Sequence, residues 1–192
     1  MKQAKTSWAT LAAVALAVTV TAQDKRPAAA PAMPPVPQPG PEHALLKGDE
    51  GVWDATIEII TPPGTQGPPP SKGTETNSLM GGMWLITDFT SDMMGTPFAG
   101  HGMLGWDSNK KKYVSVWTDN MSPGLMAGEF SYDAGKKTMT GYMEGPDMTG
   151  KLVKTTSVTE WKDPDTRVFT MYAPGPDGKE TPGLRITYKR RK

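Results

Sequence analysis

Cysteine is absent from the 192 residues of this chain. The absence excludes disulfides, thiolate nucleophiles, Cys-based zinc sites and a lipoprotein anchor. A domain of this length can bury enough apolar surface to fold without disulfides, even in an exported protein. Histidine is also scarce, because the chain has only two, His43 and His101.

The excess of positive over negative charge is small as well. The formal net charge is +1, so the chain lacks the basic field that drives binding to nucleic acid or anionic lipid. The one dense basic run, residues 189–192, is interpreted as a solvated tail that ends the last strand. A lipid or nucleic-acid contact is the less favoured interpretation. We therefore predict no nucleic-acid partner.

The first 22 residues have the three-part pattern of a secretory signal. Lys2 and Lys5 form a short positive region, residues 8–20 are mostly apolar, and Val-Thr-Ala at residues 20–22 forms a small-residue cleavage site. The apolar stretch is shorter than the ~20 residues that span a bilayer, which favours cleavage after Ala22 over a retained anchor. Cleavage lowers the net charge by two, to −1. We expect an exported protein, periplasmic or extracellular.

Residues 23–41 are predicted to be a Pro/Ala-rich disordered linker. Their core, PAAAPAMPPVPQPGP at residues 27–41, cannot form a helix because each proline removes a backbone donor and clashes with the preceding turn. It is typical of a stiff, solvated spacer. After signal cleavage, no integral membrane segment is expected.

Residues 42–192 are predicted to form one all-β domain that begins with a short helix at residues 42–47. After Gly48 the apolar residues alternate with the period of a strand, and turn signals recur at short intervals. The predicted strands are residues 52–60, 72–80, 83–90, 98–106, 113–119, 125–132, 138–144, 151–161, 167–173 and 184–189.

Short turns connect these strands, among them Asp-Ser-Asn-Lys at 107–110 and Asp-Ala-Gly-Lys at 133–136. No stretch offers a crossover helix, so a parallel sheet is not expected. An antiparallel meander of so many strands avoids exposed edges best by closing on itself. We therefore predict a closed or nearly closed up-and-down barrel rather than an open sandwich.

Several motifs of the domain resemble, in order, those of the DUF1579 family of uncharacterised bacterial proteins. They are Pro-Glu-His-Ala-Leu-Leu at 41–46 with Gly-Val-Trp-Asp at 51–54, Met-Gly-Gly-Met-Trp-Leu at 80–85, the glycine-rich run at 95–107, and Lys-Tyr-Val-Ser-Val-Trp-Thr-Asp-Asn-Met at 112–121. The resemblance extends from Glu42 to residues 186–189. It implies a lipocalin-like or avidin-like barrel and no established activity.

Gly51-x-Trp53 is also similar to the first-strand Gly-x-Trp of lipocalins, where the Trp plugs the closed end of the barrel. The chain departs from the family pattern at His101 and in the Pro-rich loop at residues 61–71. That loop has two open interpretations, a gate over the barrel mouth or a connector without a role.

The predicted ligand-binding residues come from the first strand and from the central strands and loops. Asp119 shares a strand face with Tyr113, Ser115 and Trp117. It either fixes a polar group of a ligand or caps the turn at residues 120–124. The full predicted set is Trp53, His101, Tyr113, Trp117, Asp119 and Met121.

No catalytic residue, metal or cofactor is predicted. The chain has no Gly-x-Ser-x-Gly elbow, and a triad of Ser122, His101 and Asp119 is not favoured. Methionines around His101 would suit Cu(I), but the dense Met repeat of copper carriers is missing. Haem ligation through His101 lacks a visible second ligand.

Three classes of function remain open. A barrel rich in Trp and Met suits a non-catalytic binder of a small apolar or amphipathic ligand, which is the favoured class. The first alternative is a structural or interaction protein of the cell envelope, which would expose an apolar patch. The second is a small-molecule enzyme that uses His101 and Asp119 within hydrogen-bond reach. The oligomeric state is left open.

Overall fold

A computed structural model describes residue 33 and residues 35–93, 95–174 and 179–192. The chain divides into two units, Met1–Val36 and Pro37–Lys192. In the first unit, the described residues Met33 and Val36 are exposed. The predicted signal peptide and most of the predicted linker lie outside the described residues, so both stay predictions.

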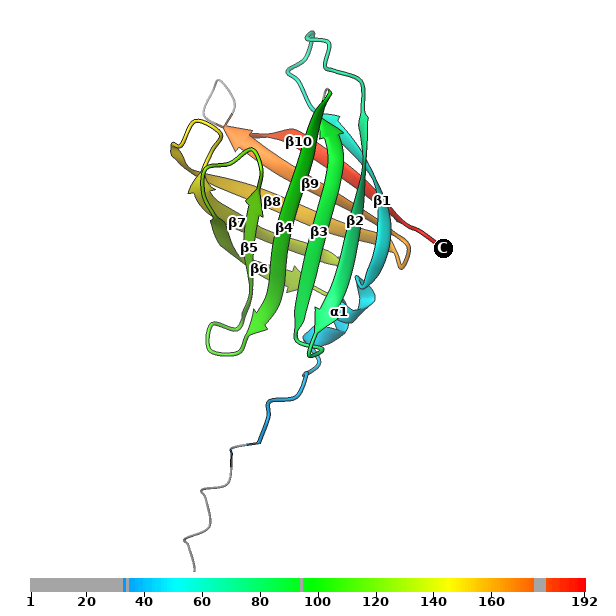
Figure 1. The fold of residues 1–192 in the computed structure, drawn as a ribbon, viewed down its shortest axis with the longest axis vertical. Helices are drawn as coiled ribbons and strands as arrows, with labels where there is room; N and C mark the ends of the chain where they lie inside the picture. Colours follow the sequence, from blue (N-terminus) through cyan, green and yellow to red (C-terminus); the bar gives the residue numbers. More distant parts are fainter. Residues whose placement is uncertain (1–32, 34, 94, 175–178) are drawn as a thin grey trace, which may run out of the picture. The chain divides into compact units, whose positions relative to one another are not determined.

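The second unit is a closed antiparallel barrel of ten strands with one short helix (Figure 1). The elements are α1 (His43–Gly48), β1 (Gly51–Ile59), β2 (Ser71–Met80), β3 (Trp84–Met93), β4 (Thr96–Asp107), β5 (Lys112–Asp119), β6 (Met126–Asp133), β7 (Thr138–Pro146), β8 (Leu152–Asp163), β9 (Thr166–Pro174) and β10 (Glu180–Arg190). Each strand pairs with its sequence neighbours, and β1 closes the barrel by pairing with β10.

The predicted fold class is confirmed: ten strands were expected and ten form, in up-and-down order. Strand ends differ from the predicted ones by a few residues, because pairing extends into flanking polar positions. The largest difference is in β10, which begins at Glu180 rather than at residue 184. There Pro182 and Leu184 flank an irregularity in the register with β9.

Alternation along each strand places every second side chain inside the barrel. In β1, Trp53, Ala55 and Ile57 are buried, whereas Asp54 between them is exposed. These three pack with Phe89 and Tyr188 in one core cluster. The strand pattern that predicted the barrel is thus the pattern that fills its interior.

Helix α1 covers one end of the barrel, where it lies at the lower end in Figure 1. Its Leu46 is 1% exposed and packs against Leu85, Tyr113 and Met139. The Tyr113 hydroxyl donates a hydrogen bond of 2.7 Å to the backbone oxygen of Glu42, which ties the helix to β5. We call this covered end the floor, and the opposite end the mouth.

The mouth is formed by the loops at residues 60–70, 120–125 and 147–151 and by the turn between β3 and β4. Within the part of the chain that the structure describes, no helix has the length and apolar character needed to cross a membrane.

Candidate ligand-binding site

A buried ion-pair cluster lies just above the floor. Arg167 of β9 donates through Nη2 to Glu75 Oε1 of β2, and its Nε lies 3.4 Å from Asp49 Oδ2. That second contact is an ion pair without hydrogen-bond geometry. All three side chains are nearly fully buried. The positions come together because Asp49 directly follows α1 at the covered end of the barrel, and because β2 and β9 direct Glu75 and Arg167 inward.

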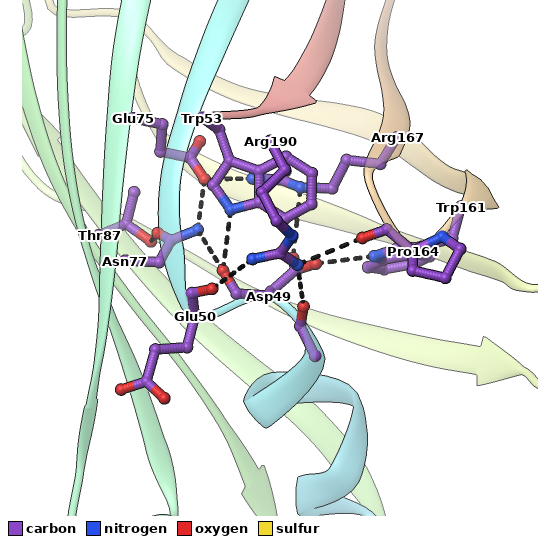
Figure 2. A network of polar contacts seen from close by, with 11 residues as sticks. Asp49, Glu50, Trp53, Glu75, Asn77, Thr87, Trp161, Pro164, Arg167 and Arg190 are labelled. Atoms are coloured by element: carbon purple, nitrogen blue, oxygen red, sulfur yellow. Dashed lines mark hydrogen bonds and ion pairs between the residues drawn. The ribbon is translucent and has the colours of Figure 1, made fainter. Parts of the chain in front are cut away.

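Neighbouring side chains donate further hydrogen bonds to the two carboxylates of the cluster (Figure 2). Trp161 Nε1 donates to Asp49 Oδ1 at 2.8 Å. Asn77 Nδ2 donates to Glu75 Oε1 at 2.6 Å and to the Asp49 backbone oxygen at 3.1 Å. The network therefore joins α1 to β2 and β8, and it seals the lower end of the barrel with hydrogen bonds.

Two guanidinium groups pack on aromatic rings at the same level. The guanidinium carbon of Arg167 lies 4.0 Å from the centre of the Tyr188 ring and 4.9 Å from that of Trp53. The guanidinium carbon of Arg190 lies 4.1 Å from the centre of the Trp53 ring. Cation–π contacts of this kind strengthen when they are desolvated. Trp53 is completely buried, so it acts as a structural plug of the floor.

Arg190 also ties α1 and the β8–β9 turn to the last strand. It donates to the backbone oxygens of Gly48, Glu50 and Pro164, and its Nε lies 3.1 Å from Asp165 Oδ1. A planar group with five donors suits this fan of acceptors. The floor is thus held by the buried Arg167 cluster and by the hydrogen bonds of Arg190.

The buried cluster changes proton affinities. Burial raises the pKa of Asp49 above its ordinary value, and Arg167 offsets part of that rise. Burial alone would lower the pKa of Arg167, but Glu75 and Asp49 raise it above its ordinary value. Burial, and then the Glu75 charge, raise the pKa of Tyr188 well above its ordinary range. Arg167 therefore stays charged and Tyr188 stays neutral.

Above the cluster the barrel encloses a cavity of about 500 Å³. This volume is within the range typical of small-molecule sites. Its walls are mainly aliphatic, aromatic and methionine side chains from all sides of the barrel. They include Ile57, Leu85, Phe89, Phe98, Leu104, Trp117, Met126, Phe130, Met139, Met143, Phe169, Met171, Leu184 and Ile186.

The cavity opens at the mouth. Met148, in the loop between β7 and β8, lines the cavity and is also 72% exposed. Leu125 and Leu152 are also exposed. They lie near Met148, since Leu152 pairs with Pro146 and the backbone of Leu125 lies against Gly145. We call Leu125, Met148 and Leu152 the apolar rim. An apolar ligand would enter past this rim.

Two of the residues predicted for the site, Trp117 and Asp119, line the cavity near its mouth. Asp119 is already engaged: its carboxylate accepts hydrogen bonds from Trp117 Nε1 at 3.0 Å and from the backbone nitrogens of Met121 and Ser122 at 2.9 and 2.8 Å. These are the bonds of a turn cap, the second of the two interpretations of this residue. A ligand would meet the Trp117 ring more readily than the Asp119 oxygens.

His101 lies on the outer wall. On β4 the inward positions are Phe98, Gly100 and Gly102, so His101 points outward, and its Nδ1 lies 2.8 Å from Asp88 Oδ1 of β3. It cannot contact a ligand held inside the barrel. The idea that His101 and Asp119 act together needs a correction, because alternation places them on opposite faces of the sheet.

The other predicted residues belong to the floor or to a loop. Trp53 and Tyr113 are buried in the floor packing, and neither is among the residues that line the cavity. Met121 lies in the loop after β5, where its backbone bonds Asp119. The Pro-rich loop predicted at residues 61–71, whose last residue begins β2, also contributes no residue to the lining.

Sequence reasoning missed Asp49, Glu75 and Arg167. One signal was present for Arg167: on β9 it falls in the same alternation as Phe169 and Met171, which marks an inward charge. Glu75 gave no such signal, because both faces of its strand, SKGTETNSLM, carry mainly polar residues and no apolar row marks the inward face. Among the described residues, no group of three or more His, Cys, Asp or Glu side chains could hold a metal ion.

The fold and the cavity define a class: a ten-stranded antiparallel barrel, sealed at one end, that encloses a largely apolar cavity. The model of the family described as "Protein of unknown function (DUF1579)" matches residues 38–190. The chain belongs to this family.

Among solved structures, the chain is similar to the crystal structure of Rv2717c from M. tuberculosis. The two are 14% identical with a TM-score of 0.57, over 80% of this chain and 99% of that one. A redesigned β-barrel matches at 15% identity and a TM-score of 0.41, over 77% of this chain and 95% of that one. The first likeness shows a shared fold. The comparison with curated proteins gave no match.

Proposed function

We propose that this protein is a non-catalytic binder of a small apolar or amphipathic molecule held in the barrel cavity. The observation that carries the proposal is a cavity of about 500 Å³ above a sealed floor. A barrel whose only task is stability would fill this volume with side chains, because interiors pack to nearly crystalline density. The retained volume therefore supports the proposal of a bound molecule.

The chemistry of the walls supports an apolar occupant. Five methionines, namely Met93, Met126, Met143, Met148 and Met171, line the half of the cavity nearer the mouth. Methionine is flexible and polarizable, so it adapts to ligand shape at little cost. The aromatic rings of Phe89, Phe98 and Trp117 add large flat contact surfaces.

The enzyme alternative has less support. General acid–base catalysis needs a titratable group within hydrogen-bond reach of the reacting atom. Neither histidine reaches the cavity: His101 is on the outer wall, and the His43 ring accepts a hydrogen bond from Gly40 N at 2.8 Å beside α1. The buried carboxylates of Glu75 and Asp49 are already paired with Arg167.

The apolar rim favours, as a second candidate, a structural or interaction protein of the cell envelope. Leu125, Met148 and Leu152 are 56%, 72% and 66% exposed. A partner that covered these residues would close the entrance, so the two functions compete for one surface. Replacing all three by serine should abolish partner capture under the second candidate and leave equilibrium ligand affinity within about twofold under the first.

The binding proposal is tested with the neutral fluorescent probe N-phenyl-1-naphthylamine, which brightens in apolar surroundings. The variant Met143→Trp/Met171→Trp fills the cavity near the mouth, and Thr140→Trp adds the same ring on the exposed face of β7 as a matched control. We expect saturable binding to the native chain and to the control. The filled variant should bind at least tenfold more weakly.

Equal binding by the native chain, the control and the filled variant would place the probe on the surface. Absence of saturable binding by the native chain would also overturn the proposal. Far-UV circular dichroism and a thermal melt of each variant establish that the barrel is intact. Bulky residues facing a void should cost less than the 1–3 kcal/mol typical of overpacking.

We also propose that the protein is exported after cleavage behind Ala22. The support is the charged, apolar and small-residue order of residues 1–22. Intact mass of the protein recovered from its host should correspond to a chain that begins at Gln23. A mass that retains residues 1–22 would contradict this proposal.

A further inference from the structure

We infer that the cavity selects an uncharged, elongated molecule that carries oxygen atoms along one edge, and that strand β8 recognises that edge. The inference rests on the proposed binding function and specifies its ligand class. It depends on a row of hydroxyl groups on one wall and on the charged side chains of the lining, which already pair with one another or cap turns.

Three successive inward positions of β8 carry hydroxyl groups: Thr155, Ser157 and Thr159, all of which line the cavity. β8 runs from the mouth at Leu152 toward the floor, where Trp161 bonds Asp49. At about 3.3 Å per residue, the row spans ~13 Å along the wall. It therefore follows the long direction of the cavity from mouth to floor.

Thr155 and Thr159 are partly buried and Ser157 is buried, and all three line the cavity. Ser157 is the most telling, because it is only 3% exposed and yet faces the cavity. Ligand oxygens along this wall can pair with these hydroxyls, since a hydroxyl can both donate and accept.

The opposite wall, on β3, offers fewer free hydroxyl groups. Thr87 donates to Asn77 Oδ1 at 2.7 Å, and Ser91 Oγ is buried without a hydrogen-bond partner among the described residues. β3 and β8 are five positions apart in the ten-strand order, so they face each other across the barrel, with β3 in front and β8 behind in Figure 1. Leu85 and Phe89 project inward from β3. A molecule between these walls would meet three hydroxyl groups on the β8 side, against the single unpaired hydroxyl of Ser91 among the described residues on the β3 side.

The charges of the lining disfavour an anion. Arg167 is the one cationic side chain among the described residues that line the cavity, and Glu75 and Asp49 already pair with it. A ligand carboxylate would find no free cation there. It would also meet Asp119 and Asp147, which accept hydrogen bonds within their own turns. The ligand's polar groups are therefore neutral oxygens.

Progesterone is a suitable probe, because it is rigid, uncharged and elongated, with a ketone oxygen near each end. Its matched comparison is the steroid acid that has a carboxylate in place of the acetyl group. Both are measured by displacement of N-phenyl-1-naphthylamine at neutral pH. We expect progesterone to displace the probe at least tenfold more effectively than the acid.

The hydroxyl row is tested with Thr155→Val/Ser157→Ala/Thr159→Val, which keeps the shape of the wall and removes its hydrogen bonds. Thr140→Val, on the exposed face of β7, is the matched control. Each lost hydrogen bond should weaken progesterone about fivefold. Affinity for N-phenyl-1-naphthylamine, which has no oxygen, should change less than twofold.

Three results would overturn this inference while the binding function stands: naphthylamine binding without progesterone binding, equal displacement by progesterone and the acid, or an unchanged progesterone affinity in the β8 variant. Failure of the proposed function is distinct, because the naphthylamine itself would then not respond to the Met143→Trp/Met171→Trp variant.

Discussion

The indole of Trp117 lies flat over Gly100: a β-carbon at Gly100 would come within 2.2 Å of the ring. Gly102, two residues further along β4, makes a similar approach at 2.9 Å. Any larger residue would displace the ring from the wall. Because these two glycines have no side chain, the indole can lie against β4, and the upper part of the cavity stays open.

We expect Gly100→Ala to move the Trp117 ring into the cavity and to weaken naphthylamine binding about tenfold. The displaced ring should also cost about 1–3 kcal/mol of unfolding free energy, as overpacking does. Both effects are measured by probe titration and urea unfolding. Gly48→Ala is the control, since a β-carbon there would meet nothing within 4 Å. Unchanged affinity in Gly100→Ala would show that the ring is not held by this glycine.

Arg167 should be the side chain on which the floor most depends. Arg167→Met leaves Glu75 and Asp49 buried without a counter-charge, which we expect to cost about 3–5 kcal/mol. Urea unfolding at neutral pH measures the loss. Arg191→Met removes an exposed pair with Asp54 and should change stability little. Similar losses in the two variants would contradict a special role of the buried cluster.

Tyr188 should make the barrel sensitive to alkali. Its folded pKa is raised well above the ordinary value of 10.0, so the folded state holds the phenol proton more tightly than the unfolded state does. The resulting stability is complete below pH 10 and is lost as pH rises above it. Urea midpoints between neutral pH and pH 11 should fall more steeply in the native chain than in Tyr188→Phe. Parallel slopes would show that Tyr188 does not titrate in this way.

Arg190 should hold α1 against the floor. Arg190→Lys keeps the charge but cannot reach the Gly48, Glu50 and Pro164 oxygens together, and we expect a loss of about 1–3 kcal/mol. Hydrogen exchange of the backbone amides at residues 46–50 should accelerate. The exposed change Lys189→Arg is the control. Unaltered exchange in Arg190→Lys would mean that the helix is held by Leu46 packing alone.

His101 should be dispensable for binding. Its side chain is on the outer wall beside Asp88, so His101→Ala should leave the affinity for N-phenyl-1-naphthylamine within twofold of the native value. The measurement is the same probe titration, with Met143→Trp/Met171→Trp as the sensitive reference. A large loss of affinity in His101→Ala would place the occupied site outside the barrel.

Much of the fold could be predicted because its information is local. Period-two alternation identified β1 from Val52, Asp54 and its neighbours, and Asp-, Asn- and Gly-containing turns separated the strands. Closure followed from the number of antiparallel strands and the cost of free edges. The sequence placed Trp117 and Asp119 on one face because they lie two residues apart on one strand, and the structure turns that face toward the cavity.

The site was harder to predict because it depends on register between distant segments. Glu75 and Arg167 are 92 residues apart, and the sequence around either residue does not indicate the other as its partner. The outward direction of His101 depends on which face of β4 joins the core, and alternation alone does not choose between the faces.

The amino-acid sequence alone determined the class of this protein, since strand period and turn chemistry act over a few residues. Only the tertiary structure decided that Asp49, Glu75 and Arg167 meet at a sealed floor, that His101 lies outside, and that about 500 Å³ stay open. The reason is physical: a cavity is the space left when side chains from ten strands have packed together, so it depends on all of them at once.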